Sequence, residues 1–316
     1  MPVLELSWRQ AAVLAAVLAV VAGGLVRTRR PRLAATGWFT GEAALLVGLF
    51  ALWQFAGSFS VLPSSGALPR GQWLWHAERW LHLPSEAAVQ RVFLPHPLLV
   101  QFANLYYAIL HFPVLLGCLA WLFIWHRDHY RRVRTTVVLF TAASLIIQFI
   151  PVAPPRLLTG SGLVDTAVLY GQSVYGSVGG FDADEFSAMP SVHVGWAIIV
   201  AVAVIAASRG RWRWLAVAYP VLTTLVVVVT ANHYWLDGVA AGLLVAGALG
   251  VQQAARSARL ALLARRAREA PDAAEGAEGT SGPDGAGERV RPSFCDVSAL
   301  REIIIAIIPA WEVCDD

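Results

Sequence analysis

The chain contains no lysine, and charged residues of any kind are scarce. All 24 basic residues are arginine, the acidic residues number 21, and charged residues make up 14% of a 316-residue sequence that is 57% hydrophobic. A soluble globular domain normally carries about 25% charged residues, so this composition excludes that class. The mean hydropathy of +0.58 indicates instead a protein that crosses a membrane several times.

Cysteine is nearly absent too. Cys118 lies inside an apolar run, and Cys295 and Cys314 lie near the C-terminus, with no C-x-x-C spacing among them. This arrangement indicates neither a zinc site nor a disulfide framework. The histidines and carboxylates of the chain are also spread in a way that requires no ion, so we expect no metal and no cofactor.

Long apolar runs, by contrast, are abundant. A membrane-spanning helix needs about 20 mostly apolar residues, and the sequence predicts about seven, which makes the expected fold an all-α, polytopic membrane bundle. We expect an N-terminal transmembrane helix with a basic loop in 1–35, a six-span core in 36–256 and a largely disordered cytoplasmic tail in 257–316. The seven spans are expected near 10–26, 38–58, 98–125, 135–152, 192–208, 214–231 and 236–254.

The arginines are distributed unevenly between alternate loops. Sixteen of the 24 fall on one side of the predicted bundle and five on the other, although the loops of the second side are longer. Because arginine-rich loops remain in the cytoplasm, we expect the crowded side to be cytoplasmic, the N-terminus to be outside and the membrane to be the plasma membrane. The four arginine-rich groups are 27–32, 127–134, 209–213 and 256–268.

Two long loops connect the spans on the outer side. The first, about 59–97, contains W-L-W-H-A-E-R-W-L-H-L at 73–83, a pattern typical of an amphipathic helix in the membrane interface. It is expected to act as a packing lid or, alternatively, as a substrate-specificity element. The second, 153–191, is rich in glycine and carries Asp182, Asp184 and Glu185, which we expect to be solvated or, alternatively, to tune a pocket.

Two histidines stand 40 residues apart at the edges of apolar segments, His193 and His233. This separation is close to one helical hairpin across a bilayer, so both should return to the same, outer side. Asp237 follows His233 by four residues, and on a helix its carboxylate can accept a hydrogen bond from the imidazole. Such a bond fixes the tautomer and leaves the other nitrogen as a nucleophile. The alternative is a helix-starting aspartate beside an interfacial histidine.

Arg156 and Ser191 are expected on the same side and indicate a phosphate site. Ser191 stands at the predicted start of the fifth span, where free backbone N–H groups attract anions. Arg156 follows two prolines that end the fourth span, and its guanidinium suits a phosphate bidentately. The alternative for Arg156 is an arginine that reaches to lipid headgroups.

A further polar set lies in the third predicted span. Asn104, Tyr107 and His111 are spaced i, i+3 and i+7, which places them on one face of a helix. Polar groups within a span normally face the bundle interior. They serve either as structural hydrogen-bonding groups or as a substrate pocket.

Three motifs resemble the signatures of the type 2 phosphatidic acid phosphatase superfamily: A-P-P-R at 153–156, M-P-S-V-H at 189–193 and H-Y-W-L-D at 233–237. The most similar branch is the one that includes inositol phosphorylceramide synthase, whose motifs read P-P-R, P-S-x-H and H-H-Y-x-x-D. The resemblance covers about 38–254. It implies a phosphoric ester hydrolase or phosphotransferase that acts on a lipid phosphate among membrane lipids, with no nucleic-acid partner; the oligomeric state is left open.

The resemblance also assigns roles to residues. It implies that His233 attacks phosphorus and forms a phosphohistidine, that Asp237 orients His233, and that His193 protonates the leaving oxygen. The phosphoryl oxygens would be held by Arg156, Ser191 and the backbone amides near Val192.

The phosphate cage departs from the superfamily pattern. The first motif usually begins with lysine, which this chain lacks, and Val227 stands where an arginine usually precedes the third-motif histidine by six residues. Either an unassigned arginine contributes or the substrate is a less charged phosphodiester. The candidate arginines are Arg70, Arg79 and Arg91.

Other functions stay open on these residues. Phosphatase and phosphotransferase differ only in whether water or an alcohol reaches the phosphoenzyme. A non-catalytic membrane binding or scaffold protein is the main alternative, since two expected cations are missing. A vanadate-dependent peroxidase would need more cations, and no inverted repeat supports a transporter.

Overall fold

The computed structural model describes residues 7–58, 66–172 and 185–278. The chain divides into two compact units, Met1–Ala258 and Arg259–Asp316. The described part of the second unit is the final portion of helix α11, and all other described helices belong to the first unit. Asp182, Asp184 and the part of the predicted tail after residue 278 lie outside the described residues.

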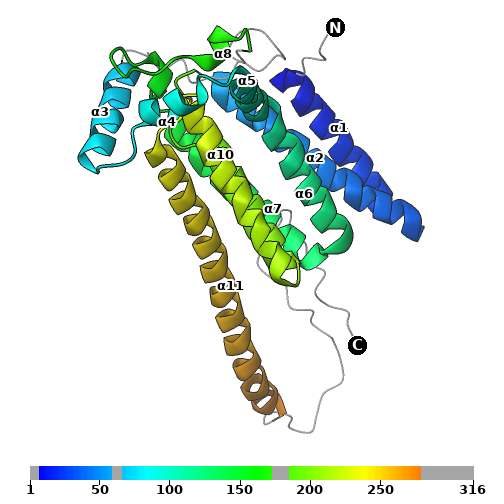
Figure 1. Ribbon diagram of the computed structural model, residues 1–316. Coiled ribbons are helices and arrows are strands. Elements are labelled where there is room, and N and C mark those ends of the chain that lie inside the picture. Colours follow the sequence, from blue (N-terminus) through cyan, green and yellow to red (C-terminus); the bar gives the residue numbers. More distant parts are fainter. Residues whose placement is uncertain (1–6, 59–65, 173–184, 279–316) are drawn as a thin grey trace. The chain divides into compact units, whose positions relative to one another are not determined.

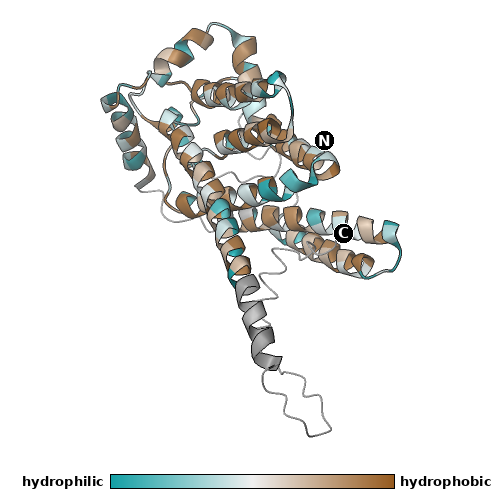
Figure 2. Cartoon of the chain, turned by 90° about the horizontal axis from the view of Figure 1, so that it is seen from below, coloured by the Kyte–Doolittle hydropathy of each residue, from teal (hydrophilic) through white to brown (hydrophobic). Residues whose placement is uncertain are grey.

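The regular elements within the described ranges are all helical, which confirms the predicted all-α class. Five helical segments are long and apolar enough to cross a membrane: Trp8–Val26, Pro31–Leu52, Pro97–Trp125, Arg211–Val229 and Trp235–Arg265. Hydrophobic residues cover much of these helices (Figure 2), and large apolar side chains such as Val20 (76% exposed) and Leu98 (81%) face outward. The protein is therefore an integral membrane bundle.

The elements that correspond to the predicted spans follow one another along the chain (Figure 1). Two of them, α7 and α9, are not both long and apolar enough to cross a membrane, so the expected number of seven spans stays a prediction. Helix α9 has 16 residues, and α7 opens with an arginine-rich turn. The elements are α1 (Trp8–Val26), α2 (Pro31–Ser58), α5 (Pro97–Leu105), η2 (Tyr106–Leu110), α6 (His111–Trp125), α7 (Arg127–Gln148), α9 (Val192–Ala207), η4 (Arg211–Val217), α10 (Ala218–Val229) and α11 (Trp235–Glu278).

Helix α1 packs along α2 as a hairpin (Figure 1). Ser7 and Gln10 form a capping box that begins α1. Helix α2 is tied to α7 by Glu42, which accepts hydrogen bonds from the guanidinium of Arg134 and from the hydroxyl of Tyr130 at 2.8 Å. The N-terminal hairpin is thus joined to the core by a charged contact as well as by apolar packing.

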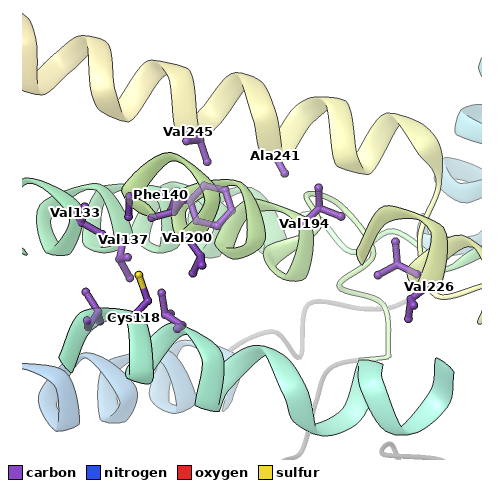
Figure 3. Close-up of a cluster of buried hydrophobic side chains, with 14 of the residues drawn as sticks. Cys118, Val133, Val137, Phe140, Val194, Val200, Val226, Ala241 and Val245 are labelled. Atoms are coloured by element: carbon purple, nitrogen blue, oxygen red, sulfur yellow. The ribbon is translucent and has the colours of Figure 1, made fainter. Parts of the chain in front are cut away.

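The core that positions the site is formed by α6, α7, α9, α10 and α11. In Figure 3, Phe140 of α7 and Val200 of α9 lie between Cys118 of α6 and Val245 of α11. Helices α7 and α9 approach closely at Gly195, where an added Cβ atom would stand 1.9 Å from the Phe140 ring. This contact fixes the position of the first turn of α9.

Shorter elements cover the end of the bundle where α9 begins. A helix is present where the amphipathic helix was predicted, as α3 (Ala67–Trp80), but the segregation of apolar and polar faces is weak: Trp73 and Trp80 are exposed and Glu78 is buried. At Gly71, an added Cβ would lie 2.7 Å from the carbonyl oxygen of Ala153, so the helix packs directly on the 153–158 segment. The other short elements are α4 (Glu86–Phe93), η3 (Pro155–Leu157) and α8 (Thr166–Leu169).

Candidate active site

His233 follows a turn at the end of α10 that contains a residue in the left-handed backbone conformation. Ala231 has φ = +54°, a left-handed conformation that is uncommon for a residue with a side chain. Its carbonyl oxygen accepts a hydrogen bond from the backbone N–H of Arg156 at 3.1 Å. The turn therefore holds the third motif against the Pro-Pro-Arg motif, 75 residues earlier in the chain.

The imidazole of His233 has one nitrogen engaged and one open. Nδ1 lies 2.6 Å from the carbonyl oxygen of Ala188 and 3.3 Å from Oδ2 of Asp237. Both are acceptors, so Nδ1 carries the hydrogen and the neutral ring presents its lone pair at Nε2. Nε2 is buried and has no hydrogen-bond partner among the described residues. Asp237 was predicted in this role, whereas the closer acceptor, a backbone carbonyl, has no sequence signal.

Asp237 is fully buried and holds several groups at once. Its Oδ2 also accepts from the backbone N–H of Tyr234 at 2.8 Å, which caps the start of α11. Its backbone oxygen accepts from the N–H of Ser191 at 3.3 Å. The residue thereby joins the third motif to the second.

His193 lies in the first turn of α9, directly beside His233. The two ring centroids are 5.8 Å apart, so the structure brings together the two histidines that the spacing argument paired. Ser191 caps α9, its Oγ accepting from the N–H of Val194 at 3.3 Å, and α9 begins at Val192.

The predicted polar set of the third span is divided. Tyr107 and His111 pack on the His193 ring, with centroid distances of 4.3 and 4.7 Å. Asn104 instead contacts the second outer loop, where it bonds Thr166 and Gln172. The physical reason is the π-helical turn η2, which adds a residue to the turn and breaks the regular α-helical spacing.

Arg156 is buried and already has partners. Its side chain is 2% exposed, with Nε 3.0 Å from Asp165 and Nη2 3.1 Å from Glu185. Nη1 donates to Oδ1 of Asn232, next to His233. The guanidinium thus faces the protein interior rather than lipid headgroups. Asp165, which also caps α8, was missed because no spacing links it to the motifs.

A phosphate would compete with these two carboxylates for the guanidinium of Arg156. The Asp165 side chain is 24% exposed and that of Glu185 is 42% exposed. Glu185 is therefore the partner that solvent can take over more readily.

Within the described residues, no second buried arginine lies beside Arg156 to replace the two cations that the superfamily pattern would supply. Val227 is 1% exposed, inside the bundle core. Among the three alternative arginines, one contacts the segment that leads to Arg156 and two bond within α3 and α4. The donors and acceptors are Arg70 Nε to Pro151 O (2.6 Å), Arg79 Nη2 to Glu86 Oε2 (2.7 Å) and Arg91 Nε to Ala87 O (3.2 Å).

Glu78 links α3 to the segment that follows His233 and was missed by the motif analysis. It is fully buried, and its Oε1 accepts from the backbone N–H of Leu236 at 2.8 Å. Burial, followed by a hydrogen bond with Glu86, raises the pKa of Glu78 to about 9. The carboxyl is therefore protonated at neutral pH. The buried positions 67, 71, 74 and 78 follow helical spacing, a signal that could have placed Glu78 inside.

Cation-binding groups do not gather in this region. Within the described ranges, no three His, Cys, Asp or Glu side chains are placed to hold a metal ion. The site that the geometry assembles consists of two imidazoles, one buried carboxylate, one guanidinium and a helix start.

The chain was also compared with known proteins. A family model described as the PAP2 superfamily matches residues 72–251, more than half of the chain. No curated protein and no solved structure gave a match. The matched range contains all three motifs and the elements that carry them, so the chain belongs to the PAP2 superfamily and is a membrane protein of the phosphatase type.

Proposed function

We propose that the protein transfers or hydrolyses the phosphoryl group of a lipid through a phosphohistidine at His233. The observation that carries the proposal is the open Nε2 of His233, whose ring is held by Ala188 O and Asp237 and lies beside His193. An imidazole fixed in one tautomer with a free lone pair is a prepared nucleophile. His193, in the first turn of α9, supplies the group that donates and accepts protons.

The reaction would proceed in two displacements. Nε2 of His233 attacks phosphorus, the bond from phosphorus to the lipid oxygen breaks, and protonated His193 gives its proton to that oxygen. The phosphorylated ring carries a positive charge that Asp237 stabilises. A water or an alcohol then attacks phosphorus, His193 takes the proton of this nucleophile, and the P–N bond breaks.

The phosphoryl oxygens would be held by the start of α9 and by Arg156. The first turn of a helix offers free backbone N–H groups, here those near Val192, and the hydroxyl of Ser191 would act as a further donor. Arg156 must exchange a carboxylate for a phosphoryl oxygen, and Glu185 is the more exposed of the two. Arg70, which donates to the carbonyl oxygen of Pro151, is a second arginine that contacts the segment leading to Arg156.

The substrate class is a lipid phosphate, and we favour transfer over hydrolysis. The P-P-R and H-Y-W-L-D motifs resemble the inositol phosphorylceramide synthase branch, and a motif set that supplies one arginine, Arg156, suits a phosphodiester of low charge. Purified protein should be assayed against phosphatidic acid, a prenyl diphosphate and phosphatidylinositol, with and without inositol. An inositol-dependent lipid product supports transfer, and free phosphate alone supports hydrolysis.

The phosphohistidine itself is tested by alkaline quench of turnover with a lipid phosphate labelled at phosphorus. Wild-type protein should retain an acid-labile, base-stable label that His233→Ala lacks. His96→Ala is the matched control, because His96 is exposed and its side chain makes no cap bond. Wild-type turnover by the His233→Ala protein would show that His233 is not the nucleophile. Absence of turnover by the wild-type protein on all of these lipids would favour the alternative, a non-catalytic binding or scaffold role.

A further inference from the structure

A polar cavity lies at the C-terminal end of α9, away from the candidate active site. It has a volume of about 670 Å³ and is bordered by the α6–α7 corner and by the link from α9 to η4. Helix α9 has 16 residues and, at 1.5 Å per residue, is about 24 Å long. The cavity is therefore separate from the site around His193. Its polar lining consists of His126, His129, Ser208, Arg209 and Arg213.

The lining of the cavity carries positive charge, and the nearest acidic residue along the chain, Asp128, is exposed and is not part of the lining. Two arginines line it, and none of its lining residues is acidic. Helices α6 and α9 both end here, and their terminal carbonyls favour cations, which accounts for arginine in general. The helix ends do not fully account for Arg213, because these carbonyls do not accept hydrogen bonds from all the N–H groups of its guanidinium.

Arg213 is the residue that points to a ligand. Its Nη1 makes a long hydrogen bond of 3.5 Å to the carbonyl oxygen of Ile205. Its Nε is buried and lacks a hydrogen-bond partner in the described part of the chain. A guanidinium has five donors, and a buried donor without an acceptor is costly. A phosphate oxygen in the cavity would satisfy it.

The surroundings of the cavity are those of a membrane interface. Trp125, Trp212 and Trp214, which flank its lining residues in the chain, are 66%, 76% and 57% exposed. Exposed tryptophans gather at the headgroup level of a bilayer. The arginine distribution predicts that this side is cytoplasmic, the side on which anionic lipids concentrate.

We propose that this cavity binds the phosphate headgroup of an anionic phospholipid from the leaflet opposite the candidate active site. Arg213 and Arg209 would bind the phosphate, and Ser208 and the two histidines would contact the remaining headgroup. The volume is within the range of about 300–1,000 Å³ that ligand pockets occupy. The inference is independent of the proposed chemistry at His233.

The test compares two single substitutions in the same turn. Arg213→Gln removes a lining cation, and Arg211→Gln removes an equal charge from an exposed arginine that is not part of the lining. Native mass spectrometry of the full chain in detergent would measure adducts with phosphatidylglycerol, phosphatidylcholine or inorganic phosphate. We expect wild type to retain phosphatidylglycerol over phosphatidylcholine, Arg213→Gln to lose these adducts by about 5-fold or more, and Arg211→Gln to resemble wild type.

Two results would overturn the proposal. Equal losses in both variants would make the arginines a diffuse positive surface rather than a site. Retention of inorganic phosphate as strong as that of phosphatidylglycerol would exclude the lipid as the source of the phosphate. Thermal melting checks that the variants fold, and Arg209→Gln, which changes the other lining arginine, provides the same comparison if Arg213→Gln unfolds.

Discussion

The arginines near the two ends of helix α9 differ in whether the protein supplies carboxylate partners for them. Near its start, Arg156 is 2% exposed and paired with Asp165 and Glu185. Near its end, Arg209 and Arg213 line a cavity that has no acidic lining residue. A buried guanidinium needs partners from the protein, whereas one at a surface cavity can take them from outside. The first end is thus organised by internal pairing, and the second is left for an external anion.

Removal of the nucleophile should produce the largest effect, and it acts on the organised end alone. We expect His233→Ala to lower kcat by about 10⁴-fold or more, as for other covalent nucleophiles. Asp237→Asn should lower it less, because Ala188 O still accepts from Nδ1 at 2.6 Å. Turnover assays of both proteins check the order, and a greater loss in Asp237→Asn would contradict it. Lipid adducts at the far cavity should not change in either.

Loss of the buried cation should damage both activity and stability. Arg156→Gln leaves Asp165 and Glu185 without their partner, and breaking a buried pair costs about 3–5 kcal/mol, an upper limit here because both carboxylates are partly exposed. Thermal unfolding in detergent measures the loss. Its partial rescue by a second change, Asp165→Asn, is expected if charge is the cause.

Removal of the Glu185 carboxylate should strengthen binding of a lipid phosphate rather than weaken it. Glu185→Gln keeps the shape of the side chain but no longer competes as a charge for the guanidinium of Arg156. We expect KM for a lipid phosphate to fall about 2- to 10-fold, an electrostatic gain of about 1 kcal/mol at a partly exposed site. An unchanged KM would show that Glu185 does not leave Arg156 during binding.

The rigid packing of α9 against α7 can be tested at Gly195. A methyl group there would stand 1.9 Å from the Phe140 ring, and overpacking of this kind costs about 1–3 kcal/mol. Gly195→Ala should therefore lower Tm. Gly247→Ala on α11 is the control, since an added Cβ there meets nothing within 4 Å; it should be neutral or stabilising. Equal Tm values for the two variants would argue against the close approach.

The last expected effect is the pH dependence of stability contributed by Glu78. Its pKa is raised from 4.5 to about 9 in the folded protein, by burial and by Glu86. Between these values the folded state keeps a proton that the unfolded state releases, so stability falls as pH rises through this window. Asp237 also raises the pKa and the bond from Leu236 lowers it.

Glu78→Gln removes this proton exchange. The decline in Tm between pH 5 and pH 9 should become shallower in the variant. Arg79, which pairs with Glu86 at 2.7 Å, remains in the variant and keeps that carboxyl partnered. The same pH slope in both proteins would mean that Glu78 is ionised in the fold.

The sequence predicts what depends on periodicity and motif spacing. Apolar runs mark the helices, and the 40-residue separation places His193 near His233. Contacts made by the backbone or set by tertiary packing were not predictable: Ala188 O has no side-chain signature, and Asp165 reaches Arg156 only because the second outer loop folds back. The π-helical turn after Leu105 also has no periodic signal, and it separates Asn104 from Tyr107.

The bond from His233 Nδ1 to the Ala188 carbonyl has a consequence for the tolerance of the chain to mutation. A main-chain acceptor survives every side-chain replacement at position 188 that keeps the local fold. A substitution can remove the Asp237 carboxylate but not the Ala188 carbonyl oxygen, so selection acts on these two acceptors unequally. A scan of single substitutions would therefore detect only Asp237 as the residue that fixes the His233 tautomer. The activity that remains after substitution of Asp237 would measure the contribution of the Ala188 carbonyl.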